Sequence, residues 1–286
     1  MSINSFINTM PLLSPQHIIS LYCFVDDHLK RLLPAPLTGR PPILADSELI
    51  TILIWHTLVS KPRTLKDLHR EVLLYQRDWF PKVPKYNGFL LQCHRVTPQL
   101  YALLHELLAR GALVKIMDAT MLPVCKSQRA DSHQVAKTMA QFGKNHQGWH
   151  YGFKLHASID LWGRLSAIVF TPAGTYDGQM IPKLVNSATR IAVGDTLYGA
   201  SVMRKKIWKK FGTIIIAPPF PKQNKKIAAP WQLKLLEARS KIESVFDVLK
   251  THLGLVTSFA RSVNGYFVHY ARILLSYQIM ALSMVV

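Results

Sequence analysis

The sequence contains few cysteines, few acidic residues and no long apolar run. Its 286 residues include three widely separated cysteines, Cys23, Cys93 and Cys125. An odd number of distant thiols argues against a disulfide framework or a four-thiolate zinc site, and it is typical of a reducing cytoplasm. The most apolar stretch, residues 273–286, is too short for a membrane span, so we expect a buried helix there. No basic leader precedes an apolar run in residues 1–13, so no signal peptide is expected.

Acidic residues number only 16 against 35 lysines and arginines, which gives a formal net charge of +19. The surplus is concentrated after residue 110, where 23 basic residues accompany 8 acidic ones. A surplus of this size indicates a polyanionic partner, nucleic acid above all, although a generally basic, solvated surface would give the same count. Hydrophobic residues make up 49% of the chain, which is enough for a packed core and excludes bulk disorder.

Residues 1–110 predict an all-helical domain. Apolar residues recur there at helical spacing, and residues that favour helix starts precede several of these stretches. We expect helices over residues 15–33, 48–59, 65–75 and 98–110, opened in turn by Ser14, Ser47, Thr64 and Thr97, with the last helix stopped at Gly111 and proline-rich turns over residues 34–42 and 80–88.

Residues 111–286 show short apolar strands that alternate with helices. The expected strands are residues 113–118, 151–159, 164–171, 190–195 and 213–218, with helices over residues 178–189, 199–211 and 230–253 and a loop over residues 119–150. An early hairpin followed by crossovers predicts an α/β domain, a mixed sheet covered by helices.

Two acidic residues close predicted strands. Asp118 and Asp195 stand at the carboxyl ends of apolar strands, where ligands collect in open α/β sheets. Neighbouring carboxylates repel unless a cation intervenes, and Mg²⁺ prefers oxygen ligands. Glu243, beside the buried stripe of a long helix, can supply a third carboxylate. The three together predict two-metal phosphoryl transfer, whereas each alone is equally expected as a turn, cap or helix-surface residue.

Arg239 and Lys250 flank Glu243 on one face of that helix. They can hold phosphates on either side of a scissile bond, arginine as a fork and lysine as a point charge. The alternative is an i,i+4 ion pair between Arg239 and Glu243 beside a solvated lysine.

The order of these blocks resembles the DDE-type transposases of bacterial insertion sequences. Arg239, Glu243 and Lys250 match the R-E-K part of the Y-R-E-K signature of the insertion-sequence 4 superfamily, with Leu236 in the place of the tyrosine. The blocks most similar to the insertion-sequence 982 family are MDATMLPVCKSQR, YGFKLH, TPAGTYDG, AVGDTLYG and RSKIESVFDVLK. The resemblance covers nearly the whole chain.

The resemblance implies a ribonuclease-H-like catalytic domain over residues 111–286, after a helical domain over residues 1–110 that binds DNA ends or supports assembly. Asp118, Asp195 and Glu243 would be its DDE triad, holding two Mg²⁺ ions for which Mn²⁺ can substitute. Such an enzyme binds terminal inverted repeats, cleaves double-stranded DNA there and joins the 3′-hydroxyls to target DNA. It would act as a homodimer or larger assembly, in the bacterial cytoplasm with the nucleoid and without a membrane.

Further DNA contacts are expected around these acids. Lys154 and His156 point the same way from the second strand, either toward DNA or under a covering helix. Residues 201–250 hold 12 basic residues against 3 acidic ones, and Trp231 there is expected in the core. The candidate contacts to the DNA backbone and to stacked bases in this segment are Arg204, Lys205, Lys206 and Trp208.

Other interpretations concern the same residues. Asp177 precedes a predicted helix and suits a cap, so it stands outside the triad. The histidines His133, His146, His150 and His156 lack the cysteine pair of a closed zinc site. The chain could also be a ribonuclease-H-like nuclease that cleaves without joining, or a DNA-binding relic without activity.

Overall fold

The computed structural model describes residues 15–32, 42–145, 148–219 and 229–283. The predicted N-terminal segment 1–13, nearly all of the proline-rich turn at 34–42, and His146 lie outside these residues. Two compact units divide the chain: residues 1–107 with 249–279, and residues 108–248 with 280–286. The first boundary lies near the predicted one at 110, but residues 249–279 return to the first unit. No described helix is long and apolar enough to cross a membrane.

The first unit is built from helices. They are α2 (Pro15–Leu32), α3 (Asp46–Val59), α4 (Leu65–Tyr75), α5 (Tyr86–Arg95), α6 (Thr97–Leu107) and most of α11 (Val263–Ser283). The start of α5 falls in a segment that its prolines marked as a turn, and α6 ends before the predicted stop at Gly111. Thr64 caps α4 as expected, accepting the backbone N–H of Asp67 at 3.1 Å. Ser47 instead lies inside α3, whose N-cap is Ala45.

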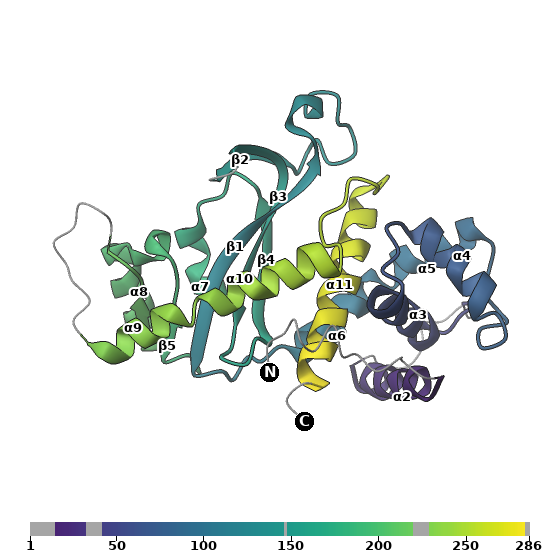
Figure 1. The fold of residues 1–286 in the computed structure, drawn as a ribbon, viewed down its shortest axis with the longest axis horizontal. Coiled ribbons are helices and arrows are strands. Elements are labelled where there is room, and N and C mark those ends of the chain that lie inside the picture. The colour runs from purple at the N-terminus through teal and green to yellow at the C-terminus, as the bar shows by residue number, and fades with distance from the viewer. Residues whose placement is uncertain (1–14, 33–41, 146–147, 220–228, 284–286) are drawn as a thin grey trace. The chain divides into compact units, whose positions relative to one another are not determined.

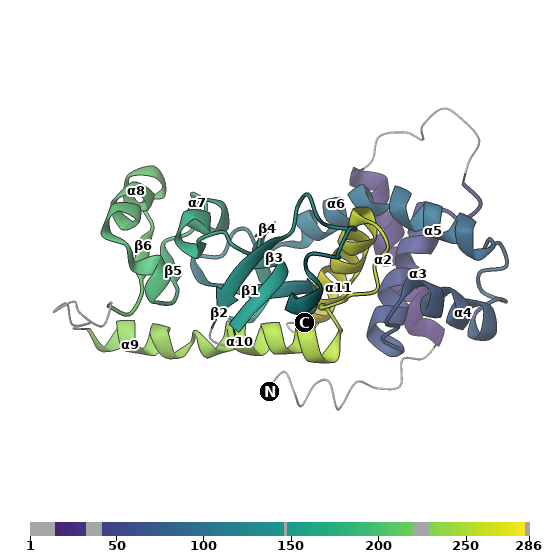
Figure 2. The ribbon, with the colours of Figure 1, turned by 90° about the horizontal axis from the view of Figure 1, so that it is seen from above.

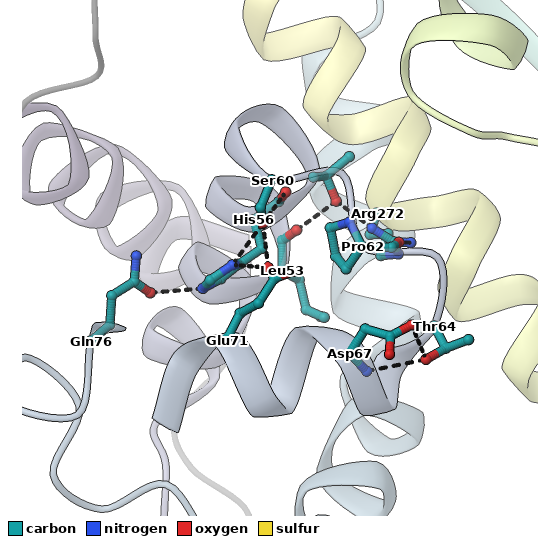
Figure 3. A network of polar contacts seen from close by, with 10 residues as sticks. Leu53, His56, Ser60, Pro62, Thr64, Asp67, Glu71, Gln76 and Arg272 are labelled. Atoms are coloured by element: carbon teal, nitrogen blue, oxygen red, sulfur yellow. Dashed lines mark hydrogen bonds and ion pairs between the residues drawn. The ribbon is translucent and has the colours of Figure 1, made fainter. Parts of the chain in front are cut away.

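A buried arginine links α11 to α3 and to the turn that follows α3 (Figure 3). Arg272 donates through Nη1 to Thr57 Oγ1 at 2.7 Å and through Nη2 to the carbonyl of Pro62 at 2.9 Å. Burial lowers the pKa of this guanidinium to about 10. Nearby, His56 Nδ1 lies 3.0 Å from Oε2 of Glu71. The hydrogen bonds of Arg272 fix the position of α11 against α3 in addition to its apolar packing. α11 is buried along most of its length, as expected for the apolar C-terminal stretch.

The second unit contains a mixed sheet. Its strands are β1 (Val114–Cys125), β2 (Gln141–Asn145), β3 (Gly148–Ile159), β4 (Leu165–Pro172), β5 (Ile191–Val193) and β6 (Ile214–Ile216). The main path is β2-β3-β1-β5-β6, and β4 pairs with β3. The pairs of β3 with β1, β2 and β4 are antiparallel, whereas β1 with β5 and β5 with β6 are parallel. The predicted hairpin followed by crossovers is confirmed.

Helices cover both faces of this sheet. The helical elements of this unit are the 3₁₀ turns η1 (Ser127–Arg129), η2 (Asp177–Met180) and η3 (Thr196–Gly199) and the helices α7 (Ile181–Leu184), α8 (Ser201–Phe211), α9 (Pro230–Glu237) and α10 (Ser240–Asp247). The π-helical segment η4 (Val248–His252) follows α10 in the chain, and all of it except Val248 belongs to the first unit. Figure 2 shows α7 and α8 on one side of the sheet and α9 and α10 on the other. Met117 of β1 packs with Ile181, Leu184 and Ile207 on the α7–α8 side.

Several predicted boundaries in this unit were wrong. β1 continues to Cys125, and the predicted loop 119–150 contains β2 and the start of β3. The long pairing of β1 with β3 keeps this segment extended. The predicted helix 178–189 is reduced to η2 and α7. The predicted helix 230–253 is interrupted between α9 and α10 and then passes into η4.

Candidate active site

The parallel pairing of β1 with β5 brings Asp118 and Asp195 to one edge of the sheet. The last paired residues are Ile116 and Val193, and each acid follows its strand's last paired residue by two positions. Asp118 lies inside β1 rather than at its end, because β1 continues along β3 after β5 has stopped. Asp195 caps η3 by accepting the backbone N–H of Leu197 at 2.9 Å. Both acids stand at the carboxyl end of one parallel pair, the edge where ligands bind in such sheets.

The two carboxyl groups are electrostatic neighbours. Burial raises the pKa of Asp118 to about 6, and repulsion from Asp195 adds to the rise. The backbone N–H of Ala119, which donates to Oδ1 of Asp118 at 2.8 Å, opposes it. Burial also raises the pKa of Asp195, with repulsion from Asp177 adding to it. Arg239 acts in the opposite direction on both acids. Carboxylates that repel one another favour a bound cation or proton.

Asp177 is electrostatically close to Asp118 and Asp195, and we call these three carboxylates the acidic cluster. The predicted role of Asp177 as a helix cap did not indicate this proximity. Oδ1 of Asp177 accepts from Lys154 Nζ at 2.9 Å, and the same ammonium donates to the carbonyl of Thr175 at 2.8 Å. His156 Nδ1 lies 3.6 Å from the same oxygen, while burial lowers the pKa of this ring to about 4 and keeps it neutral. The block TPAGTYDG was the sequence signal that could have marked Asp177.

Lys154 and His156 are therefore not exposed to a DNA partner. Lys154 is 8% exposed and His156 is fully buried, which favours the alternative of a covered strand face. Tyr198 is also fully buried, and its hydroxyl has no hydrogen-bond partner among the described residues. Burial raises the pKa of Tyr198, and the carboxylates of Asp177, Asp118 and Asp195 raise it further.

Glu243 forms an ion pair with Arg239. Arg239 Nη2 donates to Oε1 of Glu243 at 3.0 Å, so the i,i+4 ion pair, the alternative to phosphate binding, is formed. The Glu243 side chain is 56% exposed. Within the described ranges, no group of three His, Cys, Asp or Glu side chains is placed to hold a metal ion. The structure thus brings Asp118 and Asp195 together and pairs Glu243 with Arg239.

The remaining predicted contacts separate into exposed and packed residues. On α8, Lys205 and Lys206 are exposed and Trp208 is 57% exposed. Arg204 instead donates through Nη2 to the carbonyl of Ala217 at 3.3 Å, and burial lowers its pKa.

Two further expectations concern the segments around α10. Trp231 is 47% exposed, so its predicted place in the core was wrong, because α9 buries no residue fully. Lys250 lies in η4 and belongs to the first unit.

Residues 109–263 match the family model described as the transposase DDE domain. This match spans more than half of the chain and includes Asp118, Asp195 and Glu243. No solved structure matches the chain. The family match shows that this chain belongs to the transposase DDE domain family.

Proposed function

We propose that this chain is the transposase of a bacterial insertion sequence, of the insertion-sequence 982 family within the insertion-sequence 4 superfamily. The observation that carries the proposal is the place of Asp118 and Asp195, two residues beyond the β1–β5 pairing in a DDE-domain chain. The path β4-β3-β1-β5-β6, antiparallel and then parallel, supports a ribonuclease-H-like fold. The motif spacing from Arg239 to Lys250 supports the superfamily.

The acidic cluster fits a divalent cation, Mg²⁺ or Mn²⁺. Such ions are often bound by one or two carboxylates, with water and substrate phosphate as the other ligands. Asp118 and Asp195 are such a pair, and the unpartnered hydroxyl of Tyr198 beside them suits a site that is completed by another polar group. Glu243 would be the third ligand once its ion pair with Arg239 opens. Two ions held by these residues would supply a nucleophile at neutral pH and would stabilise the leaving oxygen of the phosphodiester.

The protein's own groups bind and orient the DNA. Arg239 lies close enough to Asp118 and Asp195 to affect both, so its guanidinium can hold the phosphate under attack. Lys205, Lys206 and Trp208 are exposed on α8 and can contact the DNA backbone. Such contacts give affinity without sequence recognition, so we assign the terminal inverted repeats to the helical unit. Joining two ends implies at least a homodimer, acting on the bacterial nucleoid.

A joining assay tests this proposal. The probe is a labelled DNA fragment that carries the gene with its natural flanks, incubated with Mg²⁺ and an unlabelled plasmid. We expect label to appear covalently in the plasmid. Cleavage without transfer of label would contradict the proposal in favour of a nuclease, and binding without cleavage would contradict it in favour of an inactive DNA-binding protein.

A further inference from the structure

The β2–β3 hairpin extends the sheet beyond the acidic cluster. We call this part the arm and define it as residues 126–145 and 148–151. β2 pairs with the first part of β3, as far as Gly152, and β4 pairs with β3 from Phe153 onward. Figure 1 shows this end of β2 and β3, with the segment that connects β1 to β2, projecting past the other strands.

One face of the arm carries exposed aromatic side chains. The cross-strand pairs Phe142–Tyr151 and Lys144–Trp149 place these four side chains on the same face. Trp149 is 59% exposed and Phe142 is 44% exposed, with their rings edge to face at 6.4 Å. Lys144 Nζ lies over the Trp149 ring, 5.8 Å from its centroid. Tyr151 is buried beneath Phe142, with ring centroids 5.0 Å apart, so the patch rests on a packed base.

This aromatic face continues the face of the sheet that carries Asp118. Asp118 pairs with Ala157, and side chains alternate along β3, so Tyr151 and Trp149 share the side of Ala157. Trp149 precedes Ala157 by eight residues, which corresponds to about 26 Å along an extended strand. At 3.4 Å per base pair, about seven or eight base pairs of duplex span the same distance.

The charge of the arm complements a polyanion. Its exposed basic residues are Lys126, Arg129, Lys137 and Lys144, and its exposed acidic residue among those described is Asp131. Neutral aromatic rings among lysines are suited to packing against sugars and base edges while the ammonium groups contact phosphates.

We propose that the arm is a second DNA contact of the catalytic unit, in which Trp149, Phe142 and Lys144 hold the duplex that flanks the scissile phosphate. This inference rests on the proposed function for its substrate, double-stranded DNA. Binding of DNA by the arm does not require catalysis by the acids, so this inference and the proposed function can fail separately.

The chain offers a matched control at the other end of β3. Trp162, in the turn between β3 and β4, is 66% exposed. The guanidinium of Arg164 lies over its ring, 5.2 Å from the centroid. Trp162 thus shares the exposure and the cation contact of Trp149 but lies outside the arm.

The experiment measures binding of a fluorescein-labelled 30-base-pair duplex of arbitrary sequence by anisotropy, over a range of salt concentrations. We expect Trp149→Ala to weaken binding about fivefold or more, because the packing of sugars and base edges against its aromatic ring is lost. Lys144→Gln should lower the slope of log affinity against log salt by about 0.9, because one phosphate contact is lost. Trp162→Ala should bind as the wild type does.

Two outcomes would overturn the inference. One is that Trp149→Ala and Lys144→Gln bind the duplex with the affinity and slope of Trp162→Ala. The other is that Trp149→Ala leaves DNA binding intact but lowers the oligomer mass in light scattering, which would make the arm a contact between copies of this chain. Because the duplex need not be cut, loss of the proposed function alone would leave this result unaffected.

Discussion

Arg239 donates from Nη2 to Oε1 of Glu243 at 3.0 Å, and the same arginine counteracts the raised pKa values of Asp118 and Asp195. The guanidinium of Arg239 therefore interacts electrostatically with three acidic groups, Glu243, Asp118 and Asp195. Exposed i,i+4 ion pairs contribute only a few tenths of a kcal/mol, so a cation at the two aspartates can displace the arginine from Glu243.

Arg239→Gln should tighten binding of Mn²⁺ to the protein without DNA. The substitution removes a positive charge near Asp118 and Asp195 and frees Glu243, and we expect a roughly fivefold gain, equivalent to about 1 kcal/mol. Titration calorimetry with Mn²⁺ measures it. Lys241→Gln is the matched control, because Lys241 lies on the same helix but donates to the carbonyl of Leu161 at 2.6 Å. Equal affinities in both variants would contradict this account of Arg239.

Asp118→Asn should stabilise the second unit at neutral pH in the absence of metal. The folded-state pKa of Asp118 is about 6, above its ordinary value of 3.8, so the folded chain holds this proton more tightly than the unfolded chain does. The free energy of unfolding therefore falls as the pH rises from about 4 to 6, and the full loss of about 3 kcal/mol is reached above that range. The charged neighbours that face Asp118 are Asp195, Asp177 and Arg239.

Urea unfolding of wild type and Asp118→Asn at pH 4 and pH 7.5 measures this effect. The variant should be the more stable protein at pH 7.5, and the difference should disappear at pH 4. An equal difference at both pH values would show that the gain does not arise from ionisation of Asp118.

Lys154 and Asp177 should be strongly coupled in a double-mutant cycle. Their side chains are 10% and 16% exposed, so Lys154→Met leaves the Asp177 carboxylate without its cation beside two other acids. We expect a loss of about 3 kcal/mol in the free energy of unfolding. Adding Asp177→Asn should recover part of it, with a coupling energy of about 1–3 kcal/mol. Lys30→Met, which breaks an exposed pair with Asp26 at 2.6 Å, should change stability little. Additive effects at Lys154 and Asp177 would contradict the coupling.

The order of strands and helices could be predicted from the sequence because hydrophobic periodicity and caps report local structure. The extent of a strand depends on its partners. Asp118 was expected at a strand end, but β3 pairs with β1 well beyond it. Alternation also showed that Lys154 and His156 share a face, but it carries no information on whether that face is covered.

The candidate site was predictable in part for the same reason. Strand ends pointed to Asp118 and Asp195, whose proximity depends on parallel pairing of β1 with β5. Asp177 comes close to Asp118 and Asp195 because of the tertiary contacts of the turn that carries it, such as its ion pair with Lys154. Contacts of this kind produce no periodic pattern in the sequence. The contact of Arg204 with the carbonyl of Ala217 could not be predicted either, because Arg204 lies in a basic run that was expected to contact DNA.

The central claim is that Asp118, Asp195 and Glu243 carry out metal-dependent cleavage of DNA. Its most direct test is the rate of Mg²⁺-dependent nicking of the DNA fragment with the gene's natural flanks. Wild type is compared with Asp195→Asn, Glu243→Gln and Glu237→Gln, the last an exposed glutamate six residues before Glu243. The account predicts that the first two variants nick at least about a hundredfold more slowly, because each loses a metal ligand, and that Glu237→Gln keeps the wild-type rate. Equal rates in all four proteins would contradict it.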